Sequence, residues 1–215
     1  MVRKYTTYKS YKKFGFMIVK NIFTESEAKE LSFNLANYMD EKNGKSLESE
    51  RKNSRVYPSN VIKYFPKILK CQINKNLIES LKKIFPSKPS YVNSFQLYFN
   101  VHSAGWHIDS QSQLRHKEYN NNLSIKKYKL AKVGIYLTKV PKGYNLPSIF
   151  VIPRSHRLPL IIHSLLHNFL YRVPYFSNLL NLLSLDLGTY LNPGDGIIFN
   201  HHLWHRSTPT NNSRN

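Results

Sequence analysis

Three residues of the chain have side-chain types and a spacing that suit a metal centre. His107 and Asp109 stand two positions apart, directly after Gly105-Trp106, and His205 follows much later in the chain. In an extended strand, side chains two positions apart project to the same face, so His107 and Asp109 should point together. Two imidazoles and one carboxylate form a facial triad that holds Fe(II) and leaves coordination positions open. The spacing therefore predicts a metal site made by His107, Asp109 and His205.

Other interpretations of the histidines remain open. Two His and one carboxylate with an open position also occur in zinc hydrolases, which need a general base nearby. A helical site made by His201, His202 and His205 is disfavoured, because the preceding Pro-Gly-Asp-Gly turn and the apolar run 197–199 favour strands. An isolated His is more often a structural or surface residue. We give that role to His102, His116, His163 and His167.

Length and composition limit the class of protein. A chain of 215 residues with 41% hydrophobic residues indicates one domain with a substantial core. The single cysteine, Cys71, excludes an internal disulfide and a Cys-rich zinc cluster, so we expect a reduced, cytoplasmic setting. No stretch is typical of a membrane span, because the apolar region 158–185 is interrupted by His, Asn, Arg and Pro. We expect a monomer.

The chain is strongly basic. It has 32 Lys and Arg against 12 Asp and Glu, a net charge of +20. Such an excess is typical of proteins that meet an anionic partner, such as nucleic acid, an acidic lipid face or a phosphorylated substrate. Lys, Asn, Ile, Tyr and Phe are abundant together, and all have A/T-rich codons, so coding bias is the competing explanation. The charge mildly favours an anionic small-molecule substrate, whereas nucleic acid is not expected as a partner.

The first part of the chain has helical patterns. Residues 1–13 are basic without a clear period, so we expect a loose leader, and a short strand should follow at 14–20. Thr24 and Glu27 match a capping box, which predicts an amphipathic helix over 25–40. The remaining expectations here are a polar loop over 40–55 and helices near 61–70 and 76–85.

The pattern changes to short strands after Tyr91. We predict strands at 91–101, 131–138, 148–152, 188–191, 196–200 and 203–207. The Leu-rich region 160–183 predicts one or two helices that cover a sheet, and a lid or substrate-channel wall is the alternative role. Helices first and strands afterwards favour an α+β or mainly β fold, in which N-terminal helices pack on one sheet of a β-sandwich.

Four segments of the chain carry a family resemblance. They are residues 15–21, 105–109, 150–157 and 193–196, and the last is followed by His205-Arg206-Ser207. In this order they resemble the phytanoyl-CoA dioxygenase family of Fe(II)- and 2-oxoglutarate-dependent oxygenases, over roughly residues 14 to 214. The resemblance implies a double-stranded β-helix, a cupin-like jelly roll, over 14–215. It also implies that His107, Asp109 and His205 are the iron ligands and the catalytic centre.

The resemblance further implies how 2-oxoglutarate would be held. Its far carboxylate needs a cation, and Arg suits this role because its planar fork binds carboxylate bidentately. Arg214 is the candidate, although relatives most often place this Arg at a position that would lie beyond Asn215. Ser207 should donate a hydrogen bond to the cosubstrate. Polar residues on the strand before His107 should contact cosubstrate or substrate; these are Gln96, Tyr98 and Asn100.

Two departures from the family pattern accompany this resemblance. The chain stops where the family's last strand should follow, so either the sequence is a fragment or Arg214 serves in a shortened barrel. The family usually has Gly at the position of Arg154, so we expect the turn there to differ.

The implied reaction is oxidative. 2-Oxoglutarate would be decarboxylated to succinate and carbon dioxide while O2 is used to hydroxylate a C–H bond of a small or acyl-type substrate, which the charge suggests is anionic. The alternative is a catalytically weak or inactive jelly-roll binding protein that recognises a polyanion such as nucleic acid. The intact triad favours the enzyme, whereas the missing late Arg and the high charge favour the binding protein.

Overall fold

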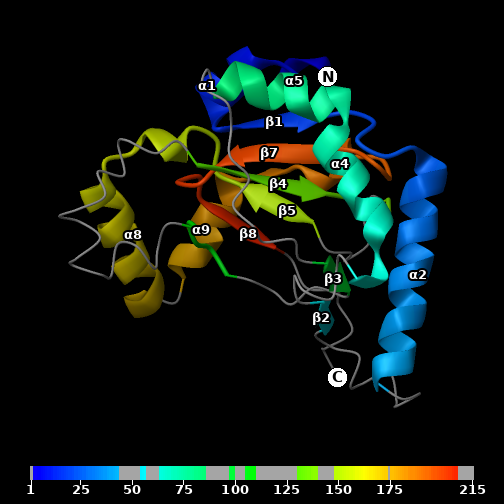
Figure 1. Cartoon of the computed structure of the whole chain (residues 1–215). Helices are drawn as coiled ribbons and strands as arrows, with labels where there is room; N and C mark the ends of the chain where they lie inside the picture. Colours follow the sequence, from blue (N-terminus) through cyan, green and yellow to red (C-terminus); the bar gives the residue numbers. More distant parts are fainter. Residues whose placement is uncertain are drawn as a thin grey trace, which may run out of the picture.

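Two three-stranded antiparallel sheets form the centre of the protein, and helices lie on both outer sides (Figure 1). The computed structural model describes residues 2–43, 54–56, 63–85, 97–99, 105–109, 130–139, 148–173 and 175–207. The first sheet has the order β1-β7-β4, with β1 at Phe16–Val19, β4 at Ala131–Ile135 and β7 at Gly196–Asn200. The second has the order β6-β5-β8, with β5 at Ile149–Val151, β6 at Leu185–Asp186 and β8 at His205–Ser207. A separate antiparallel pair joins β2 (Ser54–Val56) to β3 (Leu97–Phe99).

Strand β1 is buried on both faces and connects two parts of the core. Phe16 and Ile18 pack with Val151 of β5, in the apolar cluster that the two sheets share. Met17 and Val19 face the other way and pack with the N-terminal helices. Side chains alternate between the faces of a strand, so one short run of apolar residues serves both layers. The predicted strand over 14–20 is confirmed.

The N-terminal helices cover the outer face of the first sheet. They are the 3-10 helix η1 (Val2–Tyr5), α1 (Tyr8–Phe14), α2 (Glu25–Asn43), the 3-10 helix η2 (Pro66–Leu69), α4 (Lys70–Ile73) and α5 (Lys75–Ile84). The helices predicted at 25–40 and 76–85 are confirmed, and α2 runs on to Asn43, into the expected loop. Of the helix expected near 61–70, Lys63 and Tyr64 are helical, and the chain then forms η2 and the short α4, with Pro66 in the first turn of η2.

The expectation of a loose leader over residues 1–13 is wrong. Thr7 caps α1, because its hydroxyl accepts the Ser10 amide at 3.3 Å. Tyr11 is buried in the same cluster as Met17, so the segment is part of the packed structure. The error arose because a seven-residue helix is too short to give a clear hydrophobic period.

The predicted capping box at the start of α2 is present. The Thr24 amide donates to Glu27 Oε2 at 2.9 Å, and the Glu27 amide donates to Thr24 Oγ1 at 3.2 Å. Phe23 and Ala28, on either side of the cap, are buried in one cluster. These contacts satisfy amides that the helix itself cannot, and so fix where α2 begins.

The Pro-Gly-Asp-Gly segment is a turn, as predicted, and its carboxylate holds the start of β7. Buried Asp195 accepts the Lys20 ammonium at 2.7 Å, the Asn21 amide at 3.1 Å and the Asn192 amide at 2.8 Å. Gly194 has φ of +90°, a region that L side chains rarely adopt. The turn therefore ties β7 to the end of β1.

The strand predicted at 188–191 is wrong. This segment is the 3-10 helix η4 (Gly188–Tyr190). The Gly188 amide donates to Ser148 Oγ at 3.1 Å and to Asp186 Oδ1 at 2.9 Å, which bends the chain directly after β6. The strands predicted at 131–138, 148–152, 196–200 and 203–207 are present as β4, β5, β7 and β8, most of them shorter than expected.

Two helices cover the outer face of the second sheet, as predicted for 160–183. They are α8 (Leu160–Arg172) and α9 (Phe176–Leu182). Leu166, Leu170 and Leu180 pack there with Trp106 and Trp204. The 3-10 helix η3 (Ser155–Arg157) precedes α8 and is entered through Arg154. Arg154 has φ of 72°, a left-handed conformation that usually favours Gly.

The described strands do not form a closed barrel. Helices on antiparallel sheets are consistent with the double-stranded β-helix, and its closure stays a prediction. In the part of the chain that the structure describes, no helix is long and apolar enough to cross a membrane.

Candidate metal centre

A single β-bridge places the two histidines opposite each other. The His107 amide donates to the His205 carbonyl at 3.0 Å, and the His205 amide donates back to the His107 carbonyl at 3.0 Å. Their ring centroids are 4.3 Å apart. The segment 105–109 is this bridge with a bend and a turn, and not the extended strand that we expected. Pairing with β8 therefore positions His107.

Each imidazole is oriented by a carbonyl of its own segment. His107 Nδ1 lies 2.7 Å from the Gly105 carbonyl oxygen, and His205 Nδ1 lies 2.9 Å from the Leu203 carbonyl oxygen. A carbonyl only accepts, so each Nδ1 carries a hydrogen, and Nε2 is the nitrogen of each ring that can bind a metal. This arrangement is the usual outer-shell support of a metal-binding His.

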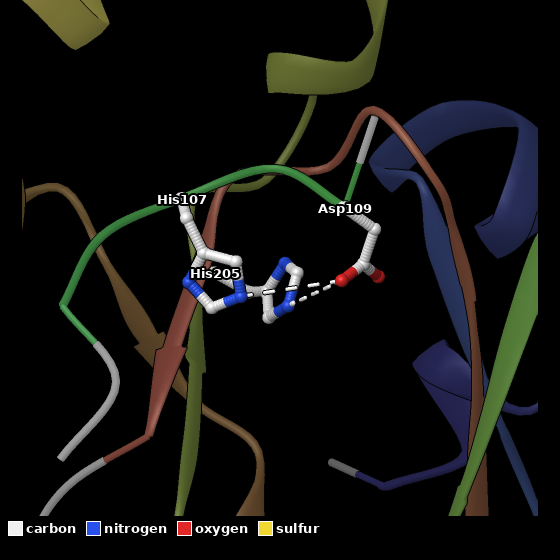
Figure 2. A group of neighbouring side chains, drawn as sticks. All are labelled: His107, Asp109 and His205. Carbon is white, nitrogen blue, oxygen red and sulfur yellow. Dashed lines mark ion pairs between the residues drawn. The ribbon is translucent and has the colours of Figure 1, made fainter. Parts of the chain in front are cut away.

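Asp109 completes a cluster of three ligand atoms (Figure 2). Its Oδ1 lies 3.7 Å from His205 Nε2 and 4.0 Å from His107 Nε2. The three ligand atoms all lie within 4.8 Å of one another, and no other such group of His, Cys, Asp or Glu occurs among the described residues. Asp109 Oδ2 is buried without a hydrogen-bond partner. Two imidazoles oriented through Nδ1 and a partly unsatisfied carboxylate fit a divalent metal ion.

Burial keeps the centre ready for a metal. It lowers the pKa of the His205 imidazole to about 4, and the Asp109 carboxylate opposes this only in part. The imidazole is therefore neutral near pH 7, which is the form that binds metals. The ring of Phe199 packs beside His205, with 4.9 Å between ring centroids, and contributes to the burial.

Lys132 of β4 is a part of the centre that the sequence did not reveal. Its ammonium lies 2.5 Å from Asp109 Oδ1, the oxygen that faces both imidazoles. The strand around Lys132 was predicted, but lysines are abundant in this chain and nothing in the pattern singles this one out. An ammonium at this distance neutralises the carboxylate when no metal is bound.

The other expected site residues have different outcomes. Ser207 stands two positions after His205 on β8, so both lie on the same face of that strand. Arg206 lies on the other face, with its guanidinium 5.4 Å from the centroid of the Trp106 ring and 4.8 Å from that of Phe150. Tyr98 lies in β3 opposite Arg55, and its side chain is outside the described part. Gln96, Asn100 and Arg214 also lie outside the described residues.

The structure supports a packing role for several aromatic and His residues. Trp106 is buried and donates through Nε1 to Asn181 Oδ1 at 3.0 Å. His163 is also buried, and its Nδ1 accepts the Trp204 indole at 2.7 Å. His201 and His202 form a turn, so the helical three-His site that we disfavoured is absent from this described segment. His102 and His116 lie outside the described residues.

Comparisons with known proteins agree with this fold. No family model matches the sequence, and the search of curated proteins found no match. The structure is similar to the non-heme alpha ketoglutarate dependent carbocyclase SnoK from nogalamycin biosynthesis, with a TM-score of 0.60 and 13% identity over 96% of this chain and 78% of that one. It is also similar to EctD from S. alaskensis with 2-oxoglutarate and 5-hydroxyectoine, with a TM-score of 0.60 and 15% identity over 94% and 69% of the two chains.

A third similar structure contains a metal. HygX from Streptomyces hygroscopicus, with nickel and 2-oxoglutarate bound, has a TM-score of 0.60 and 13% identity over 95% of this chain and 80% of that one. At such identities the likeness shows a shared fold. The chain thus has the fold of non-heme, 2-oxoglutarate-dependent enzymes, together with a His, Asp and His cluster suited to a metal.

Proposed function

We propose that the protein is an Fe(II)- and 2-oxoglutarate-dependent oxygenase. The observation that carries this proposal is the cluster of His107, Asp109 and His205, in which both imidazoles direct Nε2 toward one buried carboxylate. Two of the similar structures hold 2-oxoglutarate, and one of these also holds nickel, which supports the same cofactors here.

The three side chains have distinct roles in this proposal. His107 and His205 would bind iron through Nε2, in orientations held by the Gly105 and Leu203 carbonyls. Asp109 would supply the negative charge of the site. Iron held by these residues would supply the oxidative chemistry that uses 2-oxoglutarate and O2. The surrounding apolar residues exclude water from the His205 side of the site.

We propose that Ser207 and Arg214 hold the 2-oxoglutarate, and that Gln96 and Tyr98 contact cosubstrate or substrate. The position of Ser207 on the His205 face of β8 supports its role. Membership of the phytanoyl-CoA dioxygenase family and hydroxylation of a C–H bond are parts of the same proposal. The substrate would be a small or acyl-type molecule, and the net charge of +20 supports an anionic one.

The proposal is tested by anaerobic titration of the full chain with Fe(II) and 2-oxoglutarate. The expected result is a weak visible charge-transfer band, followed by conversion of 2-oxoglutarate to succinate when O2 is admitted. One of the similar structures is a carbocyclase, so the assay follows 2-oxoglutarate and not one particular product.

Substitution of the ligands makes this test specific. Asp109→Ala and His205→Ala should each abolish the band and the succinate. Glu79→Ala removes an exposed carboxylate on α5 and should change neither. A folded wild-type chain that gives no band and consumes no 2-oxoglutarate would disprove the proposed function.

A further inference from the structure

Helices α8 and α9 expose a large apolar surface, here named the α8–α9 patch. Ile161 is 69% exposed, Tyr175 80% and Leu182 84%. Its further members are Leu158, Leu165, Phe169, Val173, Leu179 and Leu183, all exposed. Apolar patches of this kind on a protein surface usually mark a site of interaction.

The patch is continuous across the two helices. Ile161, Leu165 and Phe169 are spaced by four positions, so they form one stripe along α8. The Phe169 ring meets the Phe176 ring of α9, with 5.8 Å between centroids, and Leu179 lies three positions further on the same helix. The opposite side of both helices packs against the core, through residues such as Leu166 and Leu180. Core packing therefore does not explain the exposed stripe.

Basic residues flank the patch, and the first carboxylate after it in the sequence is Asp186 of β6. The sequence has no Asp or Glu before Glu25, and none between Glu118 and Asp186. Arg157 Nη2 donates to the Lys12 carbonyl at 2.7 Å, so the basic end of α1 lies beside η3, just before α8. Arg172 is exposed in the last turn of α8. The acidic start of α2 lies on the other side of the sheets (Figure 1).

We propose that the α8–α9 patch docks on an anionic membrane surface. An apolar helix face with basic residues beside it lies in the boundary between headgroups and acyl chains, where both components are stabilised. A second copy of the chain would bring the same positive charges together. Nucleic acid would attract the basic residues but would not bury the exposed aliphatic side chains. Acidic lipid is the partner that matches both properties. This inference goes beyond the proposed function and does not depend on it.

The direct test places a fluorescent reporter in the patch of the full chain. Tyr175→Trp adds an indole at a position that is 80% exposed, whereas the native Trp106 and Trp204 are buried. With vesicles of phosphatidylcholine and phosphatidylserine, the emission should shift to the blue and the protein should sediment with the lipid. Vesicles of phosphatidylcholine alone, or high salt, should weaken both signals because the electrostatic attraction is lost.

Matched variants assign the binding to the patch. The double variant Ile161→Gln/Leu182→Gln should lower vesicle affinity about tenfold or more, since each side chain would otherwise be buried in lipid. Ile73→Gln replaces a side chain that is 78% exposed on α4, and should leave the affinity unchanged. Arg172→Gln should weaken binding severalfold, whereas Lys29→Gln on α2 should not. Circular dichroism checks that each variant is folded.

Three results would overturn the proposal. One is a full chain that does not bind phosphatidylserine vesicles. Another is an equal loss of binding in the patch variant and in Ile73→Gln. The third is a dimer, detected by light scattering, that the patch variant converts to monomer without any vesicle binding in the wild type, because the patch would then join two copies of the chain.

Discussion

The candidate metal centre depends on backbone contacts as much as on its three side chains. Each His ring is fixed by the carbonyl two positions before it, and the two segments are held together by the bridge between His107 and His205. Ligand atoms that share one metal ion lie about 3 Å apart. The spacings between Asp109 Oδ1 and the two Nε2 atoms, 3.7 and 4.0 Å, are longer. A metal ion held by all three side chains would therefore draw the carboxylate inward.

Lys132 should oppose that movement. Its ammonium bonds to Asp109 Oδ1 and would lie close to a bound divalent cation, so it favours the metal-free form. We expect Lys132→Met to raise the affinity for Mn(II) or Fe(II) about tenfold, a modest change because the ammonium is partly screened by water. The affinity is measured by anaerobic titration, and needs no turnover.

A control and a contrary outcome make the Lys132 test decisive. Lys139→Met removes an exposed ammonium just beyond β4 and should leave the affinity unchanged. Weaker metal binding by Lys132→Met would mean that the ammonium supports the bound carboxylate and does not compete with the metal.

At the scale of elements, the turn between η4 and β7 depends on one glycine. A Cβ on Gly194 would lie 2.1 Å from the Phe23 carbonyl oxygen, a backbone atom that cannot move without displacing the start of α2. Its φ of +90° adds strain for any other residue. We expect Gly194→Ala to lower the free energy of unfolding by about 3 kcal/mol or more, measured by urea unfolding.

Gly134 of β4 provides the comparison for that measurement. A Cβ there would meet nothing within 4 Å, so Gly134→Ala should be nearly neutral or slightly stabilising. Equal losses in the two variants would show that neither the contact with Phe23 nor the positive φ of Gly194 determines the effect.

The elements that the sequence predicted are those specified by neighbouring residues. The capping box of Thr24 and Glu27 identified the start of α2, because both partners lie within one turn. The 3-10 helix η4 was mistaken for a strand because Ser148, which binds the Gly188 amide, is distant in the sequence. Likewise, the types and order of the metal ligands could be read from the sequence. The bridge that faces His107 to His205, and the approach of Lys132, arise only in the folded chain.

At the scale of the whole molecule, the two sheets lie between two layers of helices, and several histidines are at least partly enclosed by this packing. His163 of α8 is buried against Trp204, directly before the metal-centre strand. The pKa values of His156, His201 and His202 are also lowered, in each case mainly by burial. These groups are neutral in the folded protein and become charged more easily once it unfolds.

This enclosure predicts a loss of stability in mild acid. Burial lowers the pKa of His163 to about 4, against about 6.5 in the unfolded chain, so the unfolded state binds more protons below pH 6.5. Protonation would also break the hydrogen bond that Nδ1 accepts from the Trp204 indole. From pH 7.5 to pH 5, His163 alone should lower the free energy of unfolding by about 2 kcal/mol.

Urea unfolding with a chelator present, which removes metal binding, measures this loss. His163→Asn keeps an acceptor for Trp204 and cannot titrate, so its loss over the same interval should be smaller by that amount. An unchanged loss in this variant would assign the acid sensitivity to other groups.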